Sequence, residues 1–210
     1  MRYLLVFACL LSVAIFSAQA PFTVKEYSGV ARDNEPVTCG IAFKKGECQS
    51  LSNLSLNRGG SSIPAQFSPL VRFEDGSYQW VLVDFTDNFT ANEEKSYSVT
   101  TGGGSSASSA NPLSVSSAGK RIIIDNGIIR FSLDTASFCG IDSLYYNGTA
   151  VLGGRTGGLL IKDKAFKDIW LRNGVVTKSS IVYNGKSRVT IRVEGNFYND
   201  TCGGLGFSYM

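Results

Sequence analysis

Short apolar segments separated by turn residues are the feature that most constrains the fold of this chain. The segments at 36–43, 63–73, 77–86 and 95–100 are rich in β-branched and aromatic residues, which favour strands. Glycine, asparagine and aspartate cluster between these segments, and no stretch keeps the 3.6-residue period of an amphipathic helix for long. The pattern therefore predicts an all-β protein.

A stretch of glycine, serine and alanine at 101–112 divides the strand-rich sequence. Such a composition buries too little surface to offset the entropy of ordering, which indicates a flexible linker or a long surface loop. We expect one β-domain at 21–100 and a second at 113–210. The second domain has the length of a small β-sandwich, or it is an incomplete part of a larger one.

Asn-Gly pairs mark the turns of the second domain. The segment 121–134 has apolar runs on both sides of Asn126-Gly127, a pair that tolerates the positive φ angles of a tight hairpin turn. Asn147, Asn173 and Asn184 also precede glycine, and each follows a short apolar run. These positions predict further strand ends.

The first 20 residues have the pattern of an export signal. One arginine precedes an apolar run at 4–16, and Ala18 and Ala20 have the spacing that a signal peptidase recognises. The run is too short for a membrane-spanning helix, so we expect a secreted, extracellular protein without a membrane span. Cleavage after Ala20 would leave Pro21 beside the cut, where proline fits poorly, so the position of the cut stays open.

Four cysteines follow the predicted signal, namely Cys39, Cys48, Cys139 and Cys202. An even number in an exported chain favours disulfides over metal ligation or a nucleophilic thiol. Of the three possible pairings, we favour Cys39–Cys48 and Cys139–Cys202 because each closes a bridge within one domain. The alternative is that one or more of these residues are buried thiols.

Charge and composition exclude several functions. The formal net charge of +3 includes Arg2 of the predicted signal, so the remaining chain is close to neutral and nucleic acid is not an expected partner. The sequence has no histidine, which excludes a histidine base, a serine–histidine triad and a histidine-ligated zinc site. We expect neither a metal nor another cofactor.

An acidic run contains Asp84, Asp87, Glu93 and Glu94. A calcium loop needs six to eight oxygen ligands at close and regular spacing, and the spacing of these residues does not provide it. We therefore interpret them as solvated loop charges. The glycines at 153–158 lack the strand, lysine and helix of a phosphate loop, so they indicate a turn or bulge.

Four Asn-x-Ser/Thr triplets are candidate N-glycosylation sites, and their asparagines are Asn53, Asn88, Asn147 and Asn199. All lie in or beside predicted turns, where a bulky glycan can be carried. In a eukaryotic source we expect at least two to be modified, whereas in a bacterium the triplets would usually carry no meaning.

Lysines near an aromatic residue form one candidate binding site. Lys162, Lys164 and Lys167 lie close in sequence to Trp170, and Tyr145 and Tyr146 are expected on a neighbouring strand. Aromatic rings with cations suit acidic sugars, because the ring stacks on the pyranose while lysine meets the carboxylate. The alternative is a strand edge that its lysines protect from aggregation.

Three sequence elements resemble the amino-terminal barrel domain of the rhamnogalacturonan exolyase and YetA-like family. That family shows Gly-[Ile/Val]-Pro-x-Pro-x-Gly, then Pro-x-Gln, then Trp-Pro-Asp-Gly-Ser-x-x-Trp before an apolar strand. The matching residues, in order, are Gly40, Ile41, Gly46, Pro64, Gln66, Asp75, Gly76, Ser77 and Trp80. Ala42 and Lys44 replace the two prolines of the first element, and Phe73-Glu74 replaces Trp-Pro.

The resemblance implies a small, RIFT-like β-barrel at 21–100, followed by the start of the family's central β-sandwich. It also implies that Asp75-Gly76 turns a hairpin, that Ser77 bonds locally and that Trp80 anchors the returning strand in the barrel core. In that family a later α/α toroid follows, to which the eliminating chemistry would belong. No catalytic residue is therefore carried over to this chain.

Two functions follow as expectations. The first is a secreted accessory protein of the polysaccharide-lyase type, without its own catalytic centre, that contacts acidic pectic polysaccharide. The second is a non-catalytic extracellular glycoprotein of adhesion, matrix or surface-coat assembly.

Overall fold

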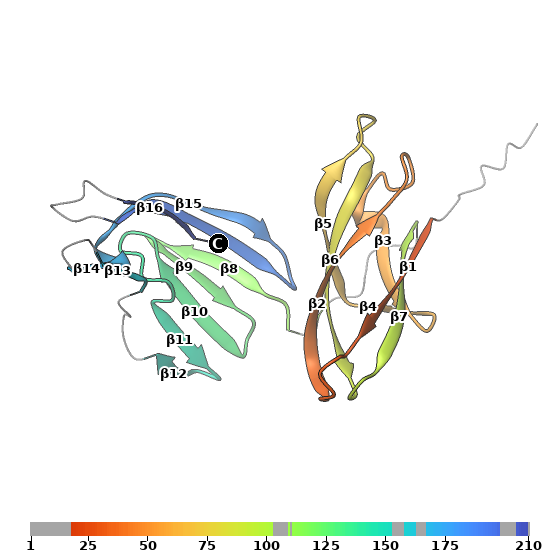
Figure 1. Cartoon of the computed structure of the whole chain (residues 1–210), viewed down its shortest axis with the longest axis horizontal. Helices are drawn as coiled ribbons and strands as arrows, with labels where there is room; N and C mark the ends of the chain where they lie inside the picture. The colour runs from red at the N-terminus through yellow and green to blue at the C-terminus, as the bar shows by residue number, and fades with distance from the viewer. Residues whose placement is uncertain are drawn as a thin grey trace, which may run out of the picture. The chain divides into compact units, whose positions relative to one another are not determined.

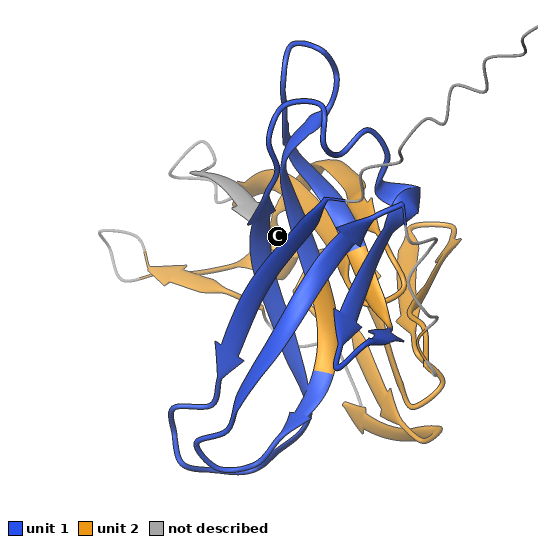
Figure 2. Cartoon of the chain, turned by 90° about the vertical axis from the view of Figure 1, so that its right-hand side faces the viewer, with its two compact units in different colours: residues 1–63, 67–83, 87–107 blue, residues 64–66, 84–86, 108–210 orange. Residues whose placement is uncertain are grey.

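The computed structural model is all-β, as the sequence predicts. It describes residues 18–102, 109, 111–152, 158–162 and 167–197, and the backbone alone of residues 205–209. The chain divides into two compact units, of which unit 1 takes residues 1–63, 67–83 and 87–107 and unit 2 takes residues 64–66, 84–86 and 108–210 (Figure 2). Most of the predicted linker, residues 103–108 and 110, lies outside the described residues.

The first seven strands form two antiparallel sheets, with the orders β1-β7-β3-β4 and β2-β6-β5 (Figure 1). A short 3-10 helix, η1 (Leu51–Asn53), precedes β3. The strands are β1 (Gln19–Lys25), β2 (Arg32–Ala42), β3 (Leu54–Arg58), β4 (Ser61–Ile63), β5 (Ala65–Arg72), β6 (Tyr78–Phe89) and β7 (Glu94–Thr101).

Alternation along these strands builds the core of unit 1. Val81 and Val83 of β6 are fully buried, as are Leu56 of β3 and Val99 of β7. Since successive residues of a strand point to opposite faces, each strand gives one set of side chains to the interior. The core therefore draws on both sheets.

The two sheets of unit 1 remain open. No hydrogen-bonded ladder joins them among the described strands, so they do not form the closed barrel that the resemblance implies. The chain passes from one sheet to the other both between β1 and β2 and between β4 and β5, which are edge strands of their sheets. The neighbouring strands β1 and β2 consequently do not pair.

Strand β1 begins inside the segment that the sequence assigned to the export signal. Gln19 pairs with Thr100 and Ala20 with Val99, and Ala18 exchanges hydrogen bonds with Thr101. Residues 18–20 therefore belong to the fold of unit 1, which begins three residues before the predicted boundary at Pro21. Residues 1–17 lie outside the described part of the chain.

Unit 2 carries sheets of the orders β12-β11-β10-β9-β8, β13-β14 and β15-β16-β17. A 3-10 helix, η2 (Leu171–Asn173), follows β14. The strands are β8 (Ser114–Ala118), β9 (Arg121–Asp125), β10 (Ile129–Asp134), β11 (Ser143–Tyr146), β12 (Thr149–Leu152), β13 (Leu160–Lys162), β14 (Asp168–Trp170), β15 (Val175–Asn184), β16 (Val189–Phe197) and β17 (Leu205–Tyr209).

One apolar core serves all three sheets of unit 2. Ile122 and Leu133 of the five-stranded sheet share it with Ile169 of β14 and Val193 of β16, around the buried ring of Phe138. Side chains of separate sheets that meet in one core are the arrangement expected of a β-sandwich.

The predicted hairpin at 121–134 is present, but its turn differs from the expected one. Only Gly127 has a positive φ, and three residues, 126–128, separate the two strands. Asn126 N donates to Ile129 O at 3.2 Å across this loop. The Asn126 side chain accepts from Ile128 N and Ile129 N and so closes the loop. The two-residue turn with positive φ at both positions occurs instead at Asn147-Gly148.

Membrane-spanning helices were sought among the described residues. None of the helices there has the length and apolar character needed to cross a bilayer.

Candidate functional site

The predicted lysine and tryptophan site lies on the β13–β14 hairpin. Lys162 pairs with Asp168 in the ladder and Leu160 pairs with Trp170, so Lys162 and Trp170 are on the same face. The Lys162 ammonium forms an ion pair with Asp168, and the Arg172 guanidinium lies 5.7 Å from the Trp170 ring. The lysine charge is therefore already compensated within the hairpin.

Other members of this predicted site are spread over unit 2. Lys167 is exposed just before β14, and Lys164 lies outside the described residues. Tyr145 of β11 lies under Arg130 of the neighbouring strand, 4.6 Å from its guanidinium. Tyr146 is exposed. The structure thus unites only Lys162 and Trp170 on one described surface.

The cysteines differ from the sequence prediction. Cys48 is a thiol in the structure, so the predicted Cys39–Cys48 disulfide is not formed. Cys48 O accepts from Tyr78 N, and Cys48 Sγ lies 4.0 Å from Ser50 O, which directs this thiol away from a bridge. Burial raises the pKa of the Cys48 thiol. Cys202, the predicted partner of Cys139, lies outside the described residues.

Three of the four candidate glycosylation sites are exposed. Asn53 belongs to η1, Asn88 is near the end of β6, and Asn147 is in the turn between β11 and β12. The Asn88 Oδ1 accepts from Asn34 N at 2.7 Å. Asn199 lies outside the described residues.

The sequence suggested that the acidic run consists of solvated loop charges, and this interpretation is wrong for Asp84 and Asp87. Asp84 is buried in β6, and the Asp87 carboxylate is bound by Arg58 and by the Tyr97 hydroxyl, which donates at 2.8 Å. Burial raises the pKa of Asp87, but the hydrogen bonds from Tyr97 and Arg58 outweigh it and the net shift is downward. Asp87 therefore joins β6 to β3 and β7 inside unit 1.

Residues of the family-like motifs meet in pairs in unit 1. Ser77 Oγ donates to Asp75 Oδ1 at 2.6 Å and accepts from Gly46 N at 3.0 Å. Gly76 has a φ of 84°, which completes the predicted hairpin turn between β5 and β6. The hydrogen bonds from Ser77 lower the pKa of Asp75. Gln66 lies apart from them, half-buried in β5.

Trp80 contradicts the expectation of a core anchor. Its neighbours Val81 and Val83 are fully buried, whereas Trp80 itself is 42% exposed on the opposite face of β6. The ring lies over Gly40 of β2, where a Cβ atom would be 3.5 Å from the ring carbon Cε3. Because glycine has no side chain, the indole can lie flat against the strand.

Trp80 borders a groove of about 600 Å³ in unit 1. Its lining comes from the edge strands β1 and β2 and from the turn that follows β2: Ala18, Gln19, Ala20, Pro21, Phe22, Gly40, Ile41, Ala42, Phe43, Lys44 and Glu47, besides Trp80. Sequence reasoning found Gly40 and Trp80 as motif residues but missed the groove. The alternation in β6 already placed Trp80 opposite Val81 and Val83, and that signal pointed to an exposed ring.

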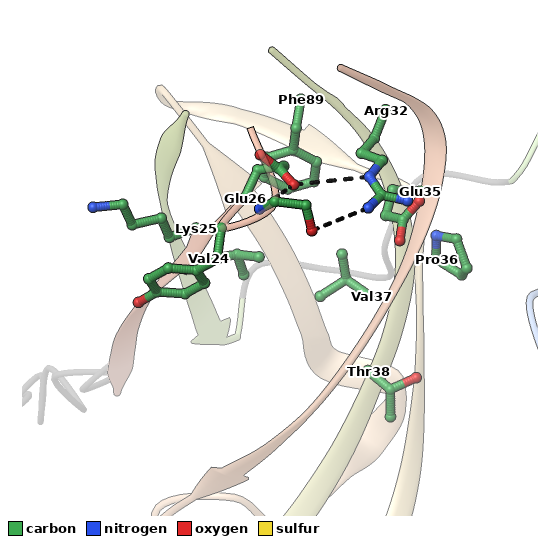
Figure 3. A pocket seen from close by; sticks show the side chains of 11 residues that line it. Val24, Lys25, Glu26, Arg32, Glu35, Pro36, Val37, Thr38 and Phe89 are labelled. Atoms are coloured by element: carbon green, nitrogen blue, oxygen red, sulfur yellow. Dashed lines mark hydrogen bonds and ion pairs between the residues drawn. The ribbon is translucent and has the colours of Figure 1, made fainter. Parts of the chain in front are cut away.

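A second pocket of about 410 Å³ lies where β1 ends and β2 begins (Figure 3). Glu26 is buried there and accepts from the backbone N–H groups of Asn92, Ser28, Gly29 and Val30. These hydrogen bonds, of which the one from Asn92 has the largest effect, lower the pKa of Glu26 from 4.5 to about 2, although burial acts in the opposite direction. Arg32 Nε is 3.9 Å from the carboxylate.

The Glu26 carboxylate has a structural task, since its oxygens are occupied by the loop that it closes. The polar chemistry that remains available in this pocket comes from Lys25, Arg32 and Glu35 at its border. Sequence reasoning did not single out Glu26. Ser28-Gly29, just after Glu26, is a sequence signal for a turn. The hydrogen bond from Asn92, 66 positions away, depends on the fold and has no such signal.

Comparison with known proteins adds no relative. No family model matches the chain, and no curated protein shows significant similarity to it. The resemblance to the rhamnogalacturonan exolyase and YetA-like family therefore stays a prediction.

Proposed function

We propose that this chain is an exported, non-catalytic β-protein of the polysaccharide-lyase type that contacts acidic pectic polysaccharide. The observation that supports the proposal is the meeting of motif residues in unit 1. Gly40 lies under Trp80, and Gly46 bonds to Ser77, although these pairs are far apart in sequence. The resemblance rests on the same residues, so the contacts give a physical reason for their spacing.

Contact with an acidic chain is assigned to the β13–β14 hairpin of unit 2. Trp170 offers a half-buried ring, Lys162 offers an ammonium group on the same face, and the exposed Lys167 precedes β14. A uronate carboxylate would compete with Asp168 for Lys162, so the expected binding is weak and depends on salt. No residue of this chain is proposed to perform elimination.

Calorimetric titration of the purified chain with rhamnogalacturonan and polygalacturonate oligosaccharides tests this function. Binding should weaken with added salt and in the double variant Lys162→Ala, Lys167→Ala. A matched control is the double variant Lys120→Ala, Lys178→Ala, which removes two other exposed lysines of unit 2. If acidic oligosaccharides do not bind, or bind equally to both variants, the proposal is wrong.

A second function, a glycoprotein of adhesion or surface-coat assembly, is favoured by a different observation. Asn53, Asn88 and Asn147 are all exposed and so accessible to glycosylation. Mass spectrometry of the exported chain before and after glycosidase treatment tests it, with Asn→Gln variants at each position. An unchanged mass would remove the support for this alternative.

A further inference from the structure

The orientation of Trp80 leaves part of its ring accessible to a ligand. One face rests on Gly40, where even a single added carbon would lie at contact distance from two ring carbons, 3.5 and 3.6 Å away. The ring is therefore supported from one side by the backbone of β2. At 42% exposure it remains open to solvent, although β6 buries its next neighbour completely.

The groove beside Trp80 adds polar groups at its border. Gln19 contributes an amide, Lys44 an ammonium and Glu47 a carboxylate, whereas Pro21 and Ala42 are apolar. These side chains supply both hydrogen-bond donors and acceptors. A volume of about 600 Å³ falls in the range of small-molecule sites.

The border of the groove is held in place before any ligand arrives. Glu47 N donates to Lys44 O at 3.1 Å, and Lys44 N donates to Glu47 Oε2 at 2.8 Å, which closes the turn after β2. Gly46 N bonds to Ser77 Oγ, so the turn is tied to the Asp75–Ser77 hairpin. A fixed border lowers the entropy lost on binding.

The charges of the lining indicate an uncharged ligand. One ammonium and one carboxylate border the groove, and no other ionisable side chain of the described residues lines it. A hexopyranose suits this combination, because its ring has an apolar C–H face for an aromatic plate and hydroxyl groups for both donors and acceptors. A uronate would meet Glu47 as well as Lys44.

We propose that the groove between Trp80, Gln19, Lys44 and Glu47 binds an uncharged hexopyranose unit of an oligosaccharide, with the sugar ring stacked on Trp80. This inference rests on the proposed role in glycan contact. It assigns a second contact, in unit 1 and without net charge, in addition to the hairpin of unit 2.

The test uses a panel of neutral gluco-, galacto- and manno-oligosaccharides, the acidic oligosaccharides above and an extended peptide of alternating apolar residues. Affinities are measured by calorimetry for the wild-type chain, Trp80→Ala and the matched control Trp170→Ala. We expect at least one neutral oligosaccharide to bind, and Trp80→Ala to weaken it roughly tenfold or more. Trp170→Ala should leave that affinity within about twofold of wild type.

Two further measurements separate a stacking site from loss of folding. Gly40→Val keeps the indole but displaces it, and should weaken the neutral sugar while the far-ultraviolet spectrum is unchanged. In the Trp170→Phe background, Trp80 is the remaining tryptophan, and its emission should shift when the sugar binds. Binding should change less than about twofold between roughly 50 and 500 mM salt, since the ligand has no charge.

The outcomes distinguish this site from the proposed function. Neutral binding that depends on Trp80, without acidic binding, supports the site and contradicts the pectic ligand. Acidic binding that Trp80→Ala leaves intact, without binding of any neutral oligosaccharide, supports the pectic ligand and overturns the site. Binding of the peptide alone, or of no oligosaccharide, also overturns it.

Discussion

Units 1 and 2 are both antiparallel β-structures, but Glu26 and Asp87 of unit 1 bond to groups on other segments, whereas Asn126 and Asp134 of unit 2 bond within their own turns. In unit 1, Glu26, Asp75 and Asp87 are tied into hydrogen-bond networks that lower the pKa of each. In unit 2, turns are closed by short side chains at the surface, such as Asn126 and Asp134. The stability of unit 1 is thereby coupled to ionisation.

Both units bury an apolar core and leave other apolar side chains exposed. The buried residues of unit 1 include Leu54 and Leu56 at 1% exposure or less. Unit 2 leaves Val151, Leu159 and Val182 more than half exposed. Unit 1 likewise leaves Tyr27, Val30 and Leu70 more than half exposed. Both units therefore have apolar side chains at the surface that a partner or ligand can cover.

The largest effect is expected from the core of unit 1. Leu56→Ala should lower the free energy of unfolding of unit 1 by about 3 kcal/mol, because it leaves a cavity at a fully buried position. Val151→Ala in unit 2 should cost less than about 0.5 kcal/mol, since this side chain is already in water. Denaturant unfolding measures both, with Trp80 or Trp170 as the single reporter of its unit.

That experiment uses the variants Trp170→Phe and Trp80→Phe, each of which leaves one tryptophan in the chain. Equal losses for the two substitutions would contradict the difference between the units. A loss in both reporters from Leu56→Ala alone would show that the units unfold together.

The second effect concerns acid. A carboxylate with a lowered folded pKa adds stability at pH values above its unfolded pKa, and the contribution is lost as the pH falls toward the folded value. For Glu26 this range runs from about pH 4.5 down to about pH 2. Asp75, Asp87 and Glu93 shift in the same direction, and all lie in unit 1.

We therefore expect the unfolding midpoint of unit 1 to fall between about pH 4.5 and pH 2, and that of unit 2 to change less. Glu26→Gln should lower the midpoint at neutral pH and flatten the acid dependence. Thermal unfolding followed at each single tryptophan provides the measurement. Earlier acid unfolding of unit 2 would refute the expectation.

The smallest effect is expected from a pair of buried serines. Ser77→Ala removes the hydroxyl that links Gly46 to Asp75, and should cost about 1–2 kcal/mol in unit 1. Ser132→Ala in unit 2 should cost less, roughly 0.5–1 kcal/mol, because Asp142 keeps its ion pair with Arg121. Equal costs would show that the two units use their buried hydroxyls alike.

The strands were predictable where alternation was regular. The segments around β2, β5, β6 and β7 show it, and the structure has strands there. Strand β1 was missed because its first residues have the composition of a cleavage site. The division of unit 1 into two open sheets was not predictable from pattern alone, since alternation tells which side chains point inward but not which edges pair.

The candidate site was predictable only in part. The spacing of Asp75, Ser77 and Trp80 indicated a hairpin and a special tryptophan, but general preference placed that large apolar ring in the core. The structure adds Gly40 on another strand, which lies so close to the indole that an added Cβ atom would touch the ring. Such a pairing becomes visible only when β2 and β6 lie side by side.

The pairing of β1 with β7 also sets an order in time. Ala18 bonds to Thr101, 83 positions later, so β1 has to wait for β7, which is synthesised after it. Until β7 emerges, β1 has no partner in its sheet, and a contact of such long range slows folding. During this interval the growing chain has an unpaired strand edge that favours aggregation. A chaperone that acts early would bind at this edge.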